Sequence, residues 1–237
     1  MAYSNSWVNS TPANPLSVVT SPTAHDTLIA WAVTDGSGLP FTWPTGFTEL
    51  ATHSGGPDGQ TAGVAIKYDA SGSEGTLQIA PTSVSCIGGI ISFSGRINTS
   101  SVHAFTTAEG HDDTSHASPL NLDLSVTPSG DSTDLASFGF ADTTSGVDAT
   151  FTASTASGTT GSWTTRQDLN SGFYNTGVAT AAQTTAGAIT ARMAMTASSN
   201  LGGVHILVGL LPSGGGGSSF VPDDLPRKIS IMALLAQ

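Results

Sequence analysis

Residues 110–116 form the densest grouping of potential metal ligands in the sequence. They read Gly-His-Asp-Asp-Thr-Ser-His, so two imidazoles five residues apart flank two carboxylates. Imidazole nitrogens and carboxylate oxygens bind many divalent ions, which makes His111, Asp113 and His116 the candidate ligands. The spacing does not match a calcium-binding loop. We therefore interpret the segment as a solvated polar crossover, and we predict no metal site and no other cofactor.

Tryptophans could supply a flat aromatic platform for a sugar ring, because their large apolar faces carry a polar N–H at the edge. Trp31 alternates with Ile29 and Val33, which predicts a position in the core. Trp43 and Trp7 are expected to be exposed. They are the candidates for a glycan-binding site.

The common motifs of hydrolases and nucleotide-binding enzymes are missing from the sequence. Ser94 lacks the first glycine of a nucleophile elbow, and there is no phosphate-binding loop, dinucleotide fingerprint or His-Glu-x-x-His motif. The three glutamates, Glu49, Glu74 and Glu109, lie far apart in the sequence, and no pair of aspartates is marked as acid and base. His205 lies in an apolar run and is interpreted as a core or edge histidine. We predict no enzymatic activity, and a hydrolase that uses unrecognised aspartates is the alternative.

The charge balance disfavours two classes of partner. The chain of 237 residues has a net charge of −11 and only six Lys and Arg residues. Nucleic-acid binding needs a basic patch that displaces counterions, and anionic membranes also attract basic segments. We predict neither nucleic acid nor membrane as a partner.

Cys86 is the only cysteine, so the chain cannot form an internal disulfide. Its position next to an apolar run predicts a buried thiol. The first residues show neither the basic nor the apolar region of a secretion signal, and the longest apolar stretches are too short to cross a bilayer. We therefore expect synthesis in a host cytoplasm.

Period-two alternation and short apolar runs predict an all-β fold. The predicted strands are residues 28–35, 64–68, 76–79, 89–93, 120–126, 134–140, 189–195 and 204–211. Turns rich in Gly, Pro, Asp and Ser separate them.

Residues 14–95 and 118–209 share a pattern that indicates an internal duplication. Asn14-Pro15-Leu16 corresponds to Ser118-Pro119-Leu120, and Gly88-Gly89 corresponds to Gly202-Gly203. Strands that are apolar on both alternations need cover on both faces. We therefore predict one antiparallel β-sandwich of jelly-roll type over residues 14–212, built from copy one (14–95), a crossover (96–117) and copy two (118–212), after an N-terminal arm (1–13).

The C-terminal region predicts a flexible Gly/Ser linker at 213–219 and an extended arm at 220–237. Apolar side chains on such a tether are costly to leave in water, so we expect the arm to bind a partner by strand addition. A last strand that folds back on its own sandwich is the alternative. The candidate partner-binding residues are Phe220, Arg227, Lys228, Ile229, Ile231, Met232, Leu234 and Leu235.

Three short segments resemble a β-sandwich family found among tailed-bacteriophage virion proteins and prophage-like bacterial genes. They are residues 26–31 (Asp-Thr-Leu-Ile-Ala-Trp), 43–48 (Trp-Pro-Thr-Gly-Phe-Thr) and 91–95 (Ile-Ser-Phe-Ser-Gly), and a second pass follows with residues 161–164 and 207–212. The likeness covers about 14–212. Phe47 stands where the family pattern has Trp, and that pattern contains no catalytic residues.

The resemblance implies a structural virion protein that decorates or cements a phage head. The partners expected from it are the major capsid protein and copies of the chain itself, in a homo-oligomer for which a trimer is an attractive state by analogy. The alternative is a carbohydrate-binding or host-adhesion module on a phage tail or shell. Either role places the protein in the virion.

Overall fold

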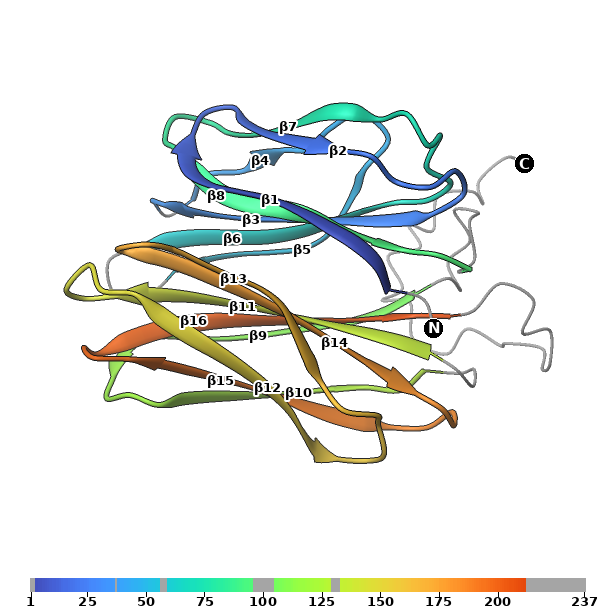
Figure 1. Cartoon of the computed structure of the whole chain (residues 1–237). Coiled ribbons are helices and arrows are strands. Elements are labelled where there is room, and N and C mark those ends of the chain that lie inside the picture. Colours follow the sequence, from blue (N-terminus) through green and yellow to red (C-terminus); the bar gives the residue numbers. More distant parts are fainter. Residues whose placement is uncertain (1–2, 37, 56–58, 96–104, 129–132, 212–237) are drawn as a thin grey trace, which may run out of the picture.

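The computed structural model describes residues 3–36, 38–55, 59–95, 105–128 and 133–211 (Figure 1). Within these residues every regular element is a β-strand, and every pairing between strands is antiparallel. The predicted all-β class is confirmed. Among the described residues, none belongs to an apolar helix of membrane-spanning length.

The first half of the chain forms two sheets. One contains β1 (Tyr3–Ala13), β3 (Thr27–Asp35), β5 (Thr48–Gly55), β6 (Gln60–Lys67) and β8 (Cys86–Phe93), in the order β1-β8-β3-β6-β5. The other contains β2 (Leu16–Thr20), β4 (Phe41–Thr42) and β7 (Gly75–Pro81), in the order β2-β7-β4.

The second half also forms a five-stranded and a three-stranded sheet. The larger one contains β9 (Phe105–His116), β11 (Thr133–Thr143), β13 (Thr164–Ser171), β14 (Tyr174–Gln183) and β16 (Leu201–Leu210), in the order β13-β14-β11-β16-β9. The smaller one contains β10 (Leu120–Val126), β12 (Ala149–Ser157) and β15 (Ile189–Ala197), in the order β10-β15-β12. Each strand takes the place of the strand numbered eight lower in the first half.

The four sheets stack as four layers (Figure 1). The two five-stranded sheets pack face to face in the centre, and a three-stranded sheet covers the outer face of each. The predicted β-sandwich therefore lies at the centre of the molecule. The two outer sheets are a feature that the sequence did not predict, and the jelly-roll comparison and the duplication stay predictions.

The central strands are buried on both faces because a layer lies above and below them. In β3, Ile29, Trp31 and Val33 point into the core between the two five-stranded sheets. Their neighbours Leu28, Ala30 and Ala32 point into the core beneath the first outer sheet. Successive side chains of β3 thus alternate between the two cores.

Cys86 lies in that outer core and is fully buried. Burial raises the pKa of its thiol to about 12. The prediction of a buried thiol is confirmed, and the neutral thiol is a poor nucleophile at physiological pH.

One glycine of each pair that marks the sequence pattern lies directly beneath a bulky side chain. A Cβ on Gly89 would lie 2.7 Å from Cη2 of Trp31 and 2.5 Å from the backbone oxygen of Trp7. A Cβ on Gly203 would lie 2.5 Å from Sδ of Met195. Gly89 makes room for the ring of Trp31 on the adjacent strand of the same sheet, whereas Gly203 makes room for Met195 of the outer sheet.

Two predicted boundaries are wrong. Residues 3–13 are not a separate N-terminal arm, because they form β1 and pair with β8 from Tyr3 to Ala13. Residues 105–116 are not a crossover, because they form β9 and pair with β16. Both are edge strands with much polar sequence, so they lack the apolar alternation of a buried strand. The predicted linker and arm at 213–237 lie outside the described residues.

Candidate functional site

The two halves meet along both edges of the central sandwich. At one edge β1 lies against β13, where Nε2 of Gln167 donates a hydrogen bond of 2.7 Å to Oγ of Ser6. The guanidinium carbon of Arg166 lies 3.7 Å from the ring centroid of Tyr3. At the other edge β5 of the first half lies against β9 of the second.

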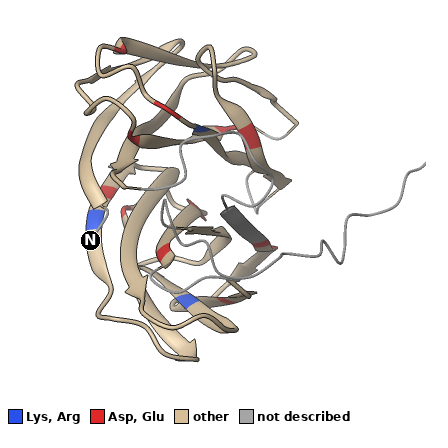
Figure 2. Ribbon diagram, turned by 90° about the vertical axis from the view of Figure 1, so that its right-hand side faces the viewer, with Lys and Arg blue, Asp and Glu red and all other residues tan. Residues whose placement is uncertain are grey.

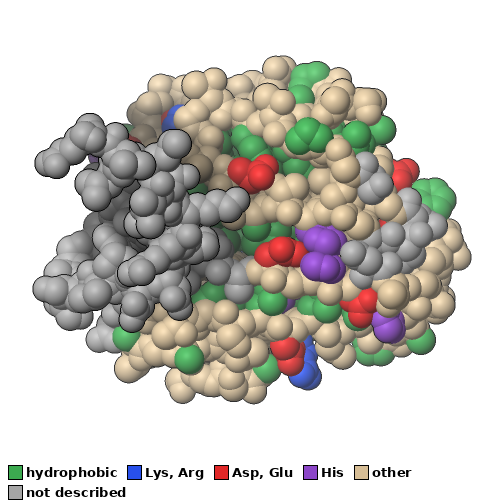
Figure 3. All heavy atoms as spheres, turned by 180° about the vertical axis from the view of Figure 1, so that it is seen from behind, with side chains coloured by type: hydrophobic (Ala, Val, Ile, Leu, Met, Phe, Trp, Pro, Cys, Tyr) green, Lys and Arg blue, Asp and Glu red, His purple; other side chains and the backbone are tan. Residues whose placement is uncertain are grey.

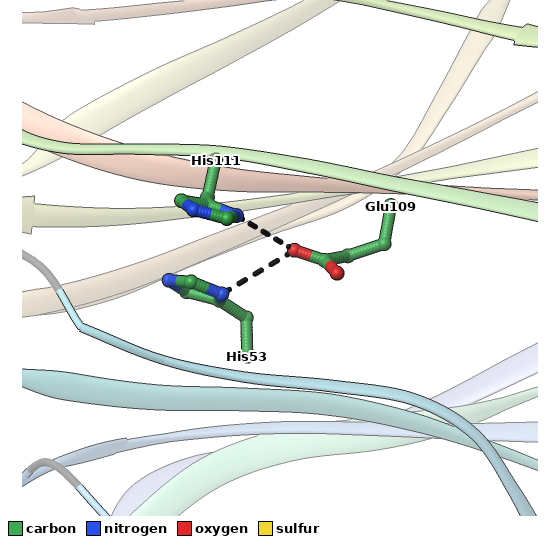
Figure 4. Close-up of side chains that lie close together, drawn as sticks. All are labelled: His53, Glu109 and His111. Carbon is green, nitrogen blue, oxygen red and sulfur yellow. Dashed lines mark hydrogen bonds and ion pairs between the residues drawn. The ribbon is translucent and has the colours of Figure 1, made fainter.

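His53 of β5 and Glu109 and His111 of β9 meet at this second edge (Figure 4). One carboxylate oxygen, Oε1 of Glu109, lies 3.3 Å from Nδ1 of His53 and 3.0 Å from Nδ1 of His111. The two imidazoles stack, with ring centroids 3.7 Å apart and planes inclined by 20°. A single oxygen thus faces both ring nitrogens.

The cluster is open to solvent on one side. The side chain of His53 is 12% exposed, that of Glu109 30% and that of His111 45%. On the face of the molecule seen from behind, histidine side chains lie at the surface beside an acidic side chain (Figure 3). A small ion can therefore reach the three donor atoms without a rearrangement of the core.

Of the sequence candidates for metal binding, the structure brings only His111 into this cluster. His116 lies further along β9, where its Nε2 is 2.8 Å from Oδ2 of Asp112 and 2.6 Å from Oγ1 of Thr114. The side chain of Asp113 lies outside what the structure describes. Sequence reasoning missed Glu109 and His53.

The two glycan candidates are half-buried and pack against the outer core of the first half. Trp43 lies against Phe41, with ring centroids 5.2 Å apart, and its Nε1 donates a hydrogen bond of 2.9 Å to Oε2 of Glu49. Trp7 is part of β1. Both rings are only partly exposed, because they cover apolar side chains of this core, and a glycan site on them stays a prediction.

His205 and Ser137 form a pair that resembles a catalytic dyad in its contacts. Oγ of Ser137 lies 2.8 Å from Nε2 of His205, and Nδ1 of His205 lies 3.0 Å from the carbonyl oxygen of Leu122. Both side chains are fully buried, so a substrate cannot reach the hydroxyl. The pair satisfies polar groups in the core, which confirms the interpretation of His205.

The buried imidazole predicts a pH-dependent stability. Burial lowers the pKa of His205 from 6.5 to about 4 in the folded protein. Below about pH 6.5 the imidazole of His205 therefore binds a proton in the unfolded chain, whereas in the folded chain it binds one only below about pH 4. Stability should be unaffected by this group above pH 6.5 and should fall by about 3 kcal/mol between pH 6.5 and 4.

Urea unfolding of the wild type and of His205→Gln across this pH range measures the effect. Glutamine keeps a polar side chain but does not titrate, so the variant should start less stable and lose less stability on acidification. Parallel pH profiles for the two proteins would assign the loss to other groups.

A search of protein families, curated proteins and solved structures finds no match to this chain. Its function must therefore be inferred from its residues and its fold.

The described basic side chains are scattered among acidic ones (Figure 2). Nζ of Lys67 lies 3.1 Å from Oε1 of Glu74, and Arg192 makes two hydrogen bonds of 2.7 and 2.8 Å to Asp123. Arg166 covers Tyr3 at the edge described above. These three lie on different strands, so they form no joint patch.

Proposed function

We propose that the chain is a structural protein of a tailed-phage particle that decorates or cements the head shell. The observation that carries the proposal is that the four-layer body uses its dyad-like residues for its own packing, as Ser137 and His205 do. The resemblance of residues 14–212 to phage β-sandwich proteins supplies the setting.

The proposed attaching element is the C-terminal segment 220–237. The strand that precedes it, β16, ends at the same end of the body as the start of β1 (Figure 1). The segment would bury its apolar side chains in a neighbouring subunit, a gross gain on the order of 7–15 kcal/mol before ordering costs. Those side chains are Ile229, Ile231, Met232, Leu234 and Leu235.

The proposed partners are the major capsid protein and neighbouring copies of this chain. Arg227 and Lys228 would pair with acidic groups on these surfaces, which adds little if the pairs are exposed. If each copy passes its segment to the next copy around a ring, the result is a closed homo-oligomer, for which a trimer suits a shell with threefold positions.

Truncation after Ser219 tests the attaching element. We expect the truncated protein to keep its thermal unfolding midpoint. It should no longer co-sediment with phage heads prepared without this protein, whereas the full chain should. The double variant Leu234→Asp/Leu235→Asp should behave in the same way. Val19→Asp is the matched control, because Val19 is 71% exposed on the first outer sheet and should not affect attachment.

Normal attachment of the truncated protein would show that the body itself binds the shell. Immunogold microscopy with antibody against residues 1–212 then locates the protein. Label over the head supports decoration, and label confined to the tail would replace it with the adhesion role. Unlabelled particles would contradict both.

A further inference from the structure

We propose that His53, Glu109 and His111 bind a divalent transition-metal ion, Zn²⁺ by preference, and that this ion joins the two halves of the molecule at the β5–β9 edge. The proposal is independent of the virion role, since it concerns the body alone.

The donor set favours zinc over the hard cations. Two imidazole nitrogens and one carboxylate oxygen are a combination that Zn²⁺ binds, whereas Ca²⁺ and Mg²⁺ prefer oxygen ligands throughout. His53, Glu109 and His111 are the one group of three His, Cys, Asp or Glu side chains in the described residues whose donor atoms all lie within 4.8 Å of one another.

The distances between donor atoms match those around a tetrahedral ion. Ligands at about 2.0–2.1 Å from zinc at tetrahedral angles lie about 3.3 Å from one another. In the structure the two nitrogen–oxygen distances are 3.3 Å and 3.0 Å. Three protein ligands leave a fourth position, which water can occupy because the cluster is solvent-accessible.

Two local changes accompany binding. Each Nδ1 must present its lone pair to the ion, so a hydrogen that it donates to Glu109 moves through solvent to Nε2. The stacked rings must also rotate apart, because the lone pairs of two parallel rings do not converge on one ion. His53 and His111 lie on edge strands, where side chains can turn without disturbing the central core.

The origin of the ligands gives the ion a structural effect. Glu109 and His111 are two residues apart on β9, so their side chains leave the same face of the strand. His53 comes from β5 in the other half. An ion held by all three binds the folded arrangement and not the unfolded chain, so it stabilises the contact between the halves.

The test is isothermal titration of Zn²⁺ into the full chain, purified without a histidine tag and freed of metal with a chelator. We expect one ion per chain. At free Zn²⁺ 100-fold above the Kd, the unfolding midpoint should rise by about 5–10 °C. Co²⁺ should give the visible absorption of a tetrahedral site, and Zn²⁺ should displace it.

The variants His53→Gln and His111→Gln should each weaken binding at least about tenfold, which at the same free Zn²⁺ reduces the shift in midpoint to about half or less. His116→Gln is the matched control, because His116 is also on β9 and also pairs with a carboxylate. If His53→Gln does not fold, the more exposed His111→Gln and Glu109→Gln decide the result. Absence of binding by the wild type, or an equal loss in His116→Gln, would overturn the proposal.

Discussion

Replacing Trp31 with alanine is expected to lower the free energy of unfolding by about 3–5 kcal/mol. Trp31 is fully buried in the core between the two five-stranded sheets, and its ring centroid lies 5.9 Å from that of Phe138 in the other half. The alanine variant leaves a cavity at the contact between the halves. Equilibrium denaturant unfolding measures the loss.

Two further variants make this result specific. Trp31→Phe keeps an aromatic ring and removes an indole N–H that has no hydrogen-bond partner among the described residues, so it should cost much less than Trp31→Ala. Phe173→Ala is the control for loss of an aromatic ring, because Phe173 is 49% exposed and should cost under about 1 kcal/mol. A cost for Trp31→Ala as small as that of the control would place the main core elsewhere.

Replacing Gly177 with alanine is expected to cost about 3 kcal/mol, at the upper end of the range for overpacking. Gly177 of β14 pairs with Gly139 of β11, and the ring of Phe151 from the outer sheet lies over both. A Cβ on Gly177 would overlap Cβ and Cγ of Phe151. These atoms are close to the backbone, so the outer sheet must move.

The matched control is Gly161→Ala. A Cβ on Gly161 would meet only the carbonyl oxygen of Ala182, at an ordinary 3.4 Å, so the change should stay within about 0.5 kcal/mol. Adding Phe151→Gly to Gly177→Ala should cost less than the sum of the single changes, because both overlapping atoms, Cβ and Cγ of Phe151, are gone. Additive costs would show that the Phe151 side chain does not cause the effect.

The strands that could be predicted from the sequence are those buried on at least one face. All eight predicted strands are present. For example, residues 120–126 form β10, and the strand predicted at 204–211 is part of β16, which ends one residue earlier. The edge strands β1, β5, β9 and β13 were not among them, and neither were the shorter or outer strands β2, β4 and β12 or the buried central strand β14. An edge strand exposes many of its side chains, so selection for apolar alternation is weak there.

The layer order was only half predictable. Apolar residues on both alternations of β3 indicate cover on both faces, and the predicted packing of one half on the other supplies one cover. The second cover is the outer sheet, whose strands β2 and β4 are only five and two residues long. Elements this short carry little periodic signal.

The cluster at the β5–β9 edge was predictable only in its local part. Glu109 and His111 have the spacing of two residues on one face of a strand. The sequence would have shown this only if residues 105–116 had been predicted as a strand. His53 joins them through the meeting of two edges far apart in the chain, which no local pattern encodes. The C-terminal attachment residues stay a prediction, because they lie outside the described part.

In each half the first strand pairs with the last, β1 with β8 and β9 with β16. A ribosome must therefore synthesise the chain to Phe93 before the first five-stranded sheet can close, and to Leu210 before the second can. Until then the apolar faces of β3 and β11 lack their partners from the opposite half. Slow non-local pairing of this kind exposes a nascent chain to aggregation, so we expect the protein to be most prone to aggregate before its last strand is made.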